Sequence, residues 1–139
     1  MPEVSPERTG WRDEGLSRRH RRWGWDCPAI DIDFLFLEYD SGKATAIIEY
    51  KNEHARPQYA SHPSYQAMMD LGTRAGVPVF ACRYSDDFSK WRVTPLNGEA
   101  KKRMARRAEM TEVEWVRFLY SLRGYDCPQE IIDGMDTEI

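Results

Sequence analysis

The segment DIDFLFLEYDSGKATAIIEYK, residues 31–51, decides the fold of this chain. It includes nearly all of two apolar runs, 30–39 and 43–51. Both runs are rich in aromatic and β-branched side chains, and this pattern predicts two neighbouring β-strands. The Asp-Ser-Gly between them is typical of a three-residue hairpin loop in which Gly42 adopts the left-handed conformation. The segment therefore predicts a β-hairpin.

The charged residues of this hairpin fall at one end of both strands. The loop sets the register, and the register opposes three pairs of residues: Tyr39 with Lys43, Asp33 with Glu49, and Asp31 with Lys51. Opposed residues point to the same face of a sheet, and a loop one residue longer or shorter would break this arrangement. The hairpin alone thus predicts a charged cluster at one margin of the sheet.

A cluster of this composition has a natural chemical role. Two carboxylates, from Asp33 and Glu49, repel each other unless a cation or a proton lies between them. A hard divalent ion such as Mg²⁺ binds both carboxylates and still has sites for water and a phosphate oxygen. Lys51 then assists the attacking water and offsets the charge that builds up on phosphorus. The cluster indicates metal-dependent phosphodiester hydrolysis, whereas the structural alternative is a charged sheet margin with a weak surface ion pair.

These residues resemble the core motif of the PD-(D/E)XK nuclease superfamily, which includes restriction endonucleases, Holliday-junction resolvases and RecB-type nuclease domains. Its first acidic residue corresponds to Asp33, and its acidic-x-Lys tripeptide to Glu49, Tyr50 and Lys51, 49 − 33 = 16 positions further on. The resemblance implies that Asp33, Glu49 and the carbonyl of Tyr50 bind Mg²⁺, for which Mn²⁺ can substitute. It further implies a DNA endo- or exonuclease that uses an activated water without a covalent intermediate.

The chain departs from the family pattern in places. Ile32, and not a proline, precedes Asp33, and Asp31 competes with Asp33 as the metal ligand. Asp33 is preferred because the uninterrupted apolar run starts directly after it. By the same resemblance, Glu14 and Gln66 are candidates for the accessory residues that some branches carry.

The rest of the chain predicts an α/β domain. Outside the hairpin, the expected elements are a helix at 13–23, a helix at 64–74, strands at 77–85 and 91–97 (the latter near an edge because of Pro95), a helix at 98–109, and a final helix to Gly124. Thr111 and Glu114 form a capping box that opens the final helix. The resemblance implies a restriction-endonuclease-like core, a central mixed sheet flanked by helices in α-β-β-β-α-β order over 13–97, with extra C-terminal helices.

Length and composition indicate one soluble domain. The chain has 139 residues, of which 41% are hydrophobic and 31% charged. We expect a flexible tail at 1–12, the nuclease-like domain at 13–124 and an acidic tail at 125–139. No apolar run has the length of a membrane span or the pattern of a signal peptide, which favours a cytoplasmic location.

The net charge of −3 is unevenly distributed. Two basic runs are candidates for contacts with DNA phosphates: Arg18, Arg19, Arg21 and Arg22 in the first, and Lys101, Lys102, Arg103, Arg106 and Arg107 in the second. A solvated helix face is the alternative for each run. The expected partner is DNA, with a homodimer or a larger nucleic-acid-processing complex as the assembly. The alternative function is a catalytically inactive nuclease fold from a phage or mobile element that binds DNA or protein.

Overall fold

The computed structural model describes residues 14–24 and 28–135. The chain divides into two units, Met1–Asp31 and Ile32–Ile139. The first contains helix α1 (Glu14–Arg22), which has an acidic residue in its first turn, basic residues in its last turn and no buried residue. This charge order complements the helix dipole, and the predicted helix at 13–23 is confirmed.

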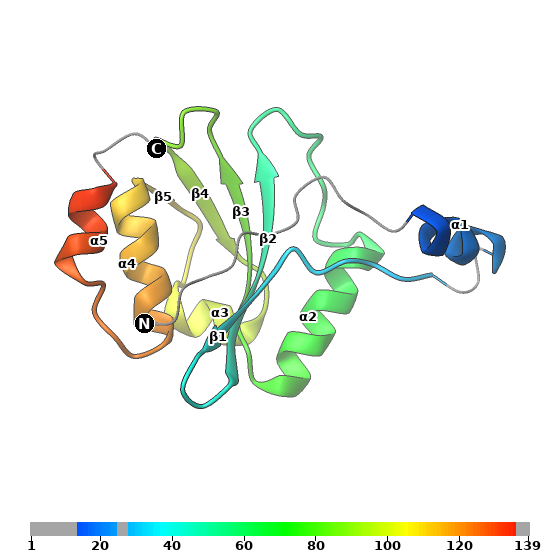
Figure 1. Cartoon of the computed structure of the whole chain (residues 1–139), viewed down its shortest axis with the longest axis horizontal. Coiled ribbons are helices and arrows are strands. Elements are labelled where there is room, and N and C mark those ends of the chain that lie inside the picture. The colour runs from blue at the N-terminus through cyan, green and yellow to red at the C-terminus, as the bar shows by residue number, and fades with distance from the viewer. Residues whose placement is uncertain (1–13, 25–27, 136–139) are drawn as a thin grey trace. The chain divides into compact units, whose positions relative to one another are not determined.

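The second unit contains a five-stranded sheet. Its strands follow one another in space as they do in the chain: β1 (Phe34–Glu38), β2 (Lys43–Asn52), β3 (Val79–Tyr84), β4 (Trp91–Pro95) and β5 (Ala108–Met110) (Figure 1). Only β2 and β3 are parallel. Parallel neighbours need a crossover connection, and helix α2 (Pro63–Ala75) provides it. The domain is therefore an α/β domain with a mixed sheet, as expected.

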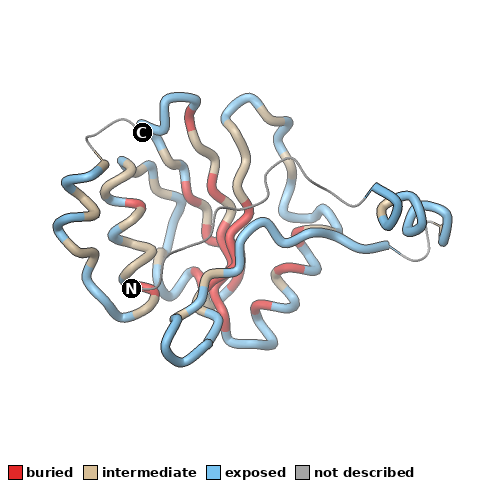
Figure 2. Tube along the Cα trace, viewed as in Figure 1, coloured by how far each residue is buried: buried red, intermediate tan, exposed pale blue. Residues whose placement is uncertain are grey.

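Helices cover both faces of this sheet. Helix α2 packs on one face, where the buried cluster consists of Ile47, Tyr65, Met68, Val77 and Val79. Helix α4 (Glu112–Leu122) packs on the other, where the buried cluster consists of Ala46, Ile48, Phe80, Cys82, Val93, Ala100, Trp115 and Leu122. Figure 2 shows the buried residues concentrated along the central strands. Because side chains alternate along a strand, Glu49 and Lys51 lie on the α2 face and Tyr50 on the α4 face.

The hairpin differs from the predicted one in its loop. Gly42 is left-handed (φ 69°), as predicted, but Glu38 pairs with Lys43, so the loop has one residue more than expected. The Glu38 carboxylate accepts hydrogen bonds from the backbone of this loop, which stabilises the longer turn and lowers the pKa of Glu38. A bulge between Phe36 and Leu37 then shifts the pairing by one residue and restores the predicted register beyond it.

Several boundaries also differ from the prediction. The first strand begins at Phe34 and not near residue 30. In the described residues, only two strands lie between α1 and α2, whereas the α-β-β-β-α-β order requires three. The helix predicted at 98–109 ends at Arg103 as α3 (Gly98–Arg103), and β5 follows it.

The C-terminal part of the chain contains one confirmed placement and one further correction. Strand β4 lies near the edge of the sheet, as predicted, because its outer neighbour β5 is the edge strand; β5 pairs with residues 91–93, and Pro95 lies beyond that pairing. The segment expected to be an acidic tail contains helix α5 (Gln129–Gly134). The predicted capping box is confirmed, since Thr111 and Glu114 bond reciprocally to each other's backbone. Among the described residues, no helix has both the length and the apolar character that a membrane span requires.

Candidate functional site

Asp33 and Glu49 meet at the margin of β1 and β2. Phe34 pairs with Ile48, so the next positions outward in this antiparallel pair are Asp33 and Glu49. Asp33 is fixed there because its Oδ2 accepts a hydrogen bond from the backbone N–H of Tyr50 at 3.1 Å. The two carboxyl groups are close enough for the negative charge of Asp33 to raise the pKa of Glu49, after the larger effect of burial.

Glu49 is held in an unfavourable environment for a carboxylate. The residue is only 9% exposed, and its Oε2 is buried without a hydrogen-bond donor from the described part of the chain. Burial raises the pKa of Glu49, and the negative charge of Asp33 raises it further. Asp33 cannot satisfy Oε2 when both groups are ionised, since two carboxylates have no proton to share. The pair therefore has an unmet requirement for positive charge.

Lys51 meets part of this requirement. Its Nζ lies 3.2 Å from Oε1 of Glu49, and the lysine side chain is one-third exposed. Both residues point to the α2 face because they are two positions apart on β2. Lys51 consequently presents its amine beside the carboxylates and at the solvent boundary, where an incoming ligand can reach it.

Tyr50 connects this cluster to the opposite face of the sheet. Its hydroxyl accepts a hydrogen bond from Nε1 of Trp115 at 3.1 Å, and burial raises the pKa of that hydroxyl. The side chain is thus part of the α4-side core, and only the backbone of Tyr50 belongs to the charged margin. A tyrosine anchored in this way fixes the strand that carries Glu49 and Lys51.

Two residues that the sequence did not single out also belong to the cluster. Tyr65, predicted only as part of an apolar helix face, is 5% exposed, and its pKa is raised by burial and then by the charge of Glu49. Arg83 pairs with Lys51 in the parallel ladder, and its Nη1 donates to the carbonyls of Asn52, Glu53 and Ala55. For Arg83, the available sequence signal was a charged residue within an otherwise apolar strand. For Tyr65, nothing in the local sequence distinguished it from a core residue.

The remaining predicted residues belong either to the first unit or to other elements of the second unit. The four α1 arginines and Glu14 belong to the first unit, where Glu14 pairs with Arg18 at 3.3 Å, and Asp31 ends that same unit. Gln66 is exposed, and its amide donates to the carbonyl of Ala60 at 3.0 Å. The second basic run lies in α3 and the turn after it, where Lys102 pairs with Glu99.

A second group of possible ligands lies on the surface. Glu53, His54 and Asp86 are exposed, and their ligand atoms lie within 4.8 Å of one another. Their acceptor atoms are already engaged: Asp86 bonds Asn52 at 2.9 Å and His54 at 2.8 Å, and Glu53 accepts the backbone N–H of Asp86. These bonds lower the pKa of Asp86, that from Asn52 most. This group satisfies itself without a cation, in contrast to Glu49.

The chemistry of the margin fits a divalent cation. Carboxylate oxygens are the preferred ligands of Mg²⁺ and Mn²⁺, and the buried Oε2 of Glu49 is an acceptor in need of a positive partner. The margin also lies at the carboxyl ends of β2 and β3, the end of a parallel strand pair where α/β proteins bind ligands. No family model matches the chain, and neither a curated protein nor a solved structure matches it significantly.

Proposed function

We propose that this chain is a Mg²⁺-dependent nuclease that hydrolyses DNA phosphodiester bonds. The observation that carries the proposal is the state of Glu49: a buried carboxylate with an unpartnered oxygen, placed beside a second carboxylate and an amine. Buried groups of like charge are costly, and such costs are concentrated at functional sites. A charged margin with only a structural role would not need to bury Glu49.

The arrangement of the strands supports a PD-(D/E)XK-like core. Asp33 precedes β1, the acidic-x-Lys tripeptide ends β2, and the helix that follows returns the chain to a parallel β3. This is the local order that the family motif requires, although one strand of the α-β-β-β-α-β order is not found in the described residues. The finer fold class is therefore part of the proposal.

Each residue of the cluster has a distinct role in this proposal. Asp33, Glu49 and the carbonyl of Tyr50 hold the ion, which when bound lowers the pKa of water and offsets negative charge on the phosphate. Lys51 orients the attacking water and donates to a non-bridging phosphate oxygen. The water oxygen forms the new bond to phosphorus and releases a proton to solvent, the bond to the leaving oxygen breaks, and that oxygen takes a proton from solvent.

Tyr65 and Arg83 act as positioning residues. Tyr65 closes the α2 side of the cluster with a largely buried ring, which limits the access of water to Glu49. Arg83 holds three carbonyls of the turn after β2 and so fixes the end of the strand that carries Lys51. Both therefore support the geometry on which an electrostatic site depends.

The test is cleavage of supercoiled, branched and single-stranded DNA by the purified chain in Mg²⁺, in Mn²⁺ and in chelator. Glu49→Gln and Lys51→Ala are each expected to lower the cleavage rate by about 100-fold or more. Helix α2 offers a matched control, because Arg74 and Asp70 in its last turns form an exposed pair at 3.0 Å. Asp70→Asn and Arg74→Ala should leave the rate unchanged.

Two results would contradict the proposal. Equal cleavage by both sets of variants would assign the activity to a contaminant. DNA binding without cleavage in any cation would favour an inactive nuclease fold that only binds its target.

A further inference from the structure

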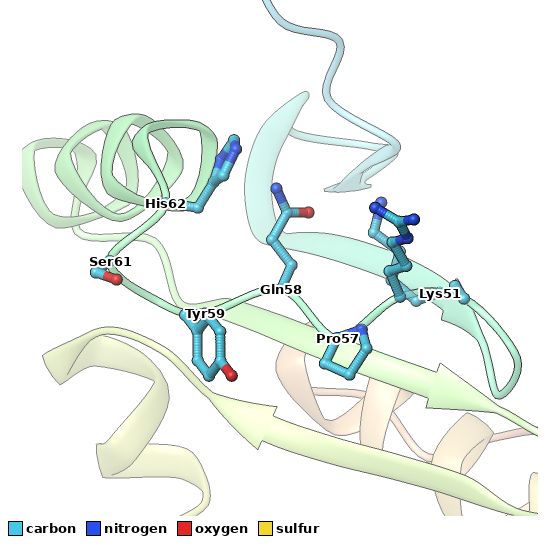
Figure 3. A pocket seen from close by; sticks show the side chains of 8 residues that line it. Lys51, Pro57, Gln58, Tyr59, Ser61 and His62 are labelled. Atoms are coloured by element: carbon cyan, nitrogen blue, oxygen red, sulfur yellow. The ribbon is translucent and has the colours of Figure 1, made fainter.

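A cavity lies directly beside Lys51. It has a volume of about 550 Å³ and is formed mainly by the segment between β2 and α2 (Figure 3). Its lining consists of Lys51, Ala55, Arg56, Pro57, Gln58, Tyr59, Ser61 and His62. This volume is within the range of cavities that bind ligands of nucleotide size. Lys51 belongs both to the cavity and to the charged margin, so a ligand in the cavity would extend toward Asp33 and Glu49.

The lining has the charge of an anion-binding site. It contains the cations Lys51 and Arg56 and several uncharged donors, but no carboxylate. In the described part of the chain, Arg56 has neither a hydrogen bond nor an ion pair to another side chain, and it is exposed. An unpaired guanidinium in a concave site is well suited to a phosphate group, which it can bind with two parallel hydrogen bonds.

His62 contributes a donor of defined position. Its Nδ1 accepts the backbone N–H of Ser64 at 3.1 Å, and this bond caps α2. Nδ1 must therefore be unprotonated, which leaves the proton on Nε2 as a donor. The N-terminal end of the 13-residue helix α2 begins at this same residue, and its dipole adds positive potential.

Hydrogen bonds from β3 and from α2 hold the cavity wall in place. Arg83 of β3 donates to the carbonyl of Ala55 at 2.8 Å, and Gln66 of α2 donates to the carbonyl of Ala60 at 3.0 Å. The backbone N–H of His62 also donates to the carbonyl of Tyr59 at 2.9 Å. A connection fixed at three points is preorganised for binding, and Gln66 thereby serves the cavity wall and not the cation site.

We infer that this cavity binds a phosphate of the DNA strand that neighbours the phosphate at the charged margin. The ligand's identity rests on the proposed function, whereas its charge and size follow from the cavity itself. In this arrangement Arg56 and His62 hold the neighbouring phosphate, Gln58 lies on the same side of the segment as His62 (Figure 3), and Lys51 lies between the two phosphate positions. The cavity thus sets the register of the strand over Asp33 and Glu49.

Binding without cleavage tests this inference. Anisotropy of a fluorescein-labelled single-stranded oligodeoxynucleotide, titrated with the full chain in chelator at several salt concentrations, gives the affinity and its salt slope. Arg56→Ala is expected to weaken binding by roughly tenfold and to reduce the salt slope by about 1. The matched control is Arg117→Ala, which removes the same charge from an exposed position on α4, the helix that packs on the opposite face. It should change the affinity by less than about twofold.

His62→Asn provides a second, structure-neutral variant. Asparagine retains a good N-cap but lacks the Nε2 donor, so binding should weaken while the melting temperature stays unchanged. Titration of a 5′-phosphorylated strand and of a duplex of the same sequence distinguishes an internal phosphate from a terminal one. If the terminal phosphate increases the affinity and Arg56→Ala removes that increase, the cavity is assigned to strand ends.

The outcomes separate this inference from the hydrolase proposal. Equal affinities of Arg56→Ala and Arg117→Ala, or no binding by the unaltered chain, would overturn the cavity assignment even if Mg²⁺-dependent cleavage is found. Arg56-dependent binding without cleavage in any cation would uphold the cavity and overturn the hydrolase.

Discussion

Glu49 and Asp87 are both carboxylates of the second unit, but folding shifts their pKa values in opposite directions. Asp87, in the turn between β3 and β4, accepts hydrogen bonds from the hydroxyl and the backbone N–H of Ser89 and from the hydroxyl of Ser85, which lower its pKa to about 2. Glu49 is buried with one oxygen unpartnered and a carboxylate beside it, and its pKa is raised. The folded state thus favours the charged form of Asp87 and disfavours that of Glu49.

This difference separates a structural acid from a candidate functional one. Hydrogen bonds to Asp87 stabilise its charged form and order the turn, so the fold itself explains the residue. The fold does not explain Glu49, because a glutamine or an apolar side chain would fit the margin at lower cost. A residue that lowers stability where it stands is expected to be retained for its chemistry.

The largest expected effect concerns stabilisation by a divalent cation. An ion that binds only the folded chain stabilises it by about 2.7 kcal/mol at 100 times its dissociation constant. Mg²⁺ or Mn²⁺ should therefore raise the melting temperature of the unaltered chain and of Asp87→Asn, and Glu49→Gln should abolish the increase. Thermal denaturation after removal of metals, with and without added cation, measures this.

His54→Ala is the control for the location of the ion. It removes one member of the exposed group of Glu53, His54 and Asp86 and leaves the charged margin intact. The increase in melting temperature should persist in this variant. If the cation no longer raised the melting temperature of His54→Ala but still raised that of Glu49→Gln, the cation site would be assigned to the exposed group.

The next effect is on the stability of the metal-free chain at neutral pH. In Glu49→Gln the amide can donate to Asp33, so a repulsion is replaced by a hydrogen bond and the free energy of unfolding should rise by on the order of 1 kcal/mol. Asp87→Ala should lower the melting temperature, because three donors in the turn lose their acceptor. Asp126→Ala removes the same charge from an exposed position with no hydrogen bond in the described residues, and it should leave stability unchanged. A lower free energy of unfolding in Glu49→Gln would show that the Glu49 carboxylate stabilises the folded chain.

The contrast between these two acids also shows what the sequence could predict. The opposition of Asp33 and Glu49 follows from strand pattern and turn chemistry, both of which are local. The assumed loop was nevertheless too short by one residue, and the register survived because a bulge in the strand pair compensated for it. The capping role of the Glu38 carboxylate, which stabilises the longer loop, depends on backbone geometry that no periodicity reveals.

Other features could not be predicted because they depend on distant parts of the chain. Tyr65 joins the cluster only through the docking of α2, and Arg83 joins it only through the parallel register of β2 and β3. Strand β5 has three residues directly after the second basic run, and its pairing with β4 determines its conformation. Local propensity favours a helix there, and the tertiary pairing overrides it.

The smallest and most specific effect is on the pH dependence of stability. The pKa of Asp87 is lowered from 3.8 to about 2 on folding, so its contribution is fully present above 3.8 and is lost as the pH falls toward 2. The pKa of Glu49 is raised above 4.5, so its contribution is present below 4.5 and is lost as the pH rises through the folded value. The two acids should therefore give pH dependences of opposite sign.

Urea denaturation in chelator measures both dependences when each variant is compared with the unaltered chain. The stability advantage over Asp87→Asn should grow as the pH rises from 2 to 4, whereas the stability relative to Glu49→Gln should fall as the pH rises from 4.5 to 7. Each comparison cancels the titration of distant groups, so the difference reports on Asp87 in one case and on the interacting pair of Glu49 and Asp33 in the other. If the stability relative to Glu49→Gln instead rose with pH, as that relative to Asp87→Asn should, Glu49 would be stabilised in its charged form without a cation, and the principal reason for placing an ion between Asp33 and Glu49 would be gone.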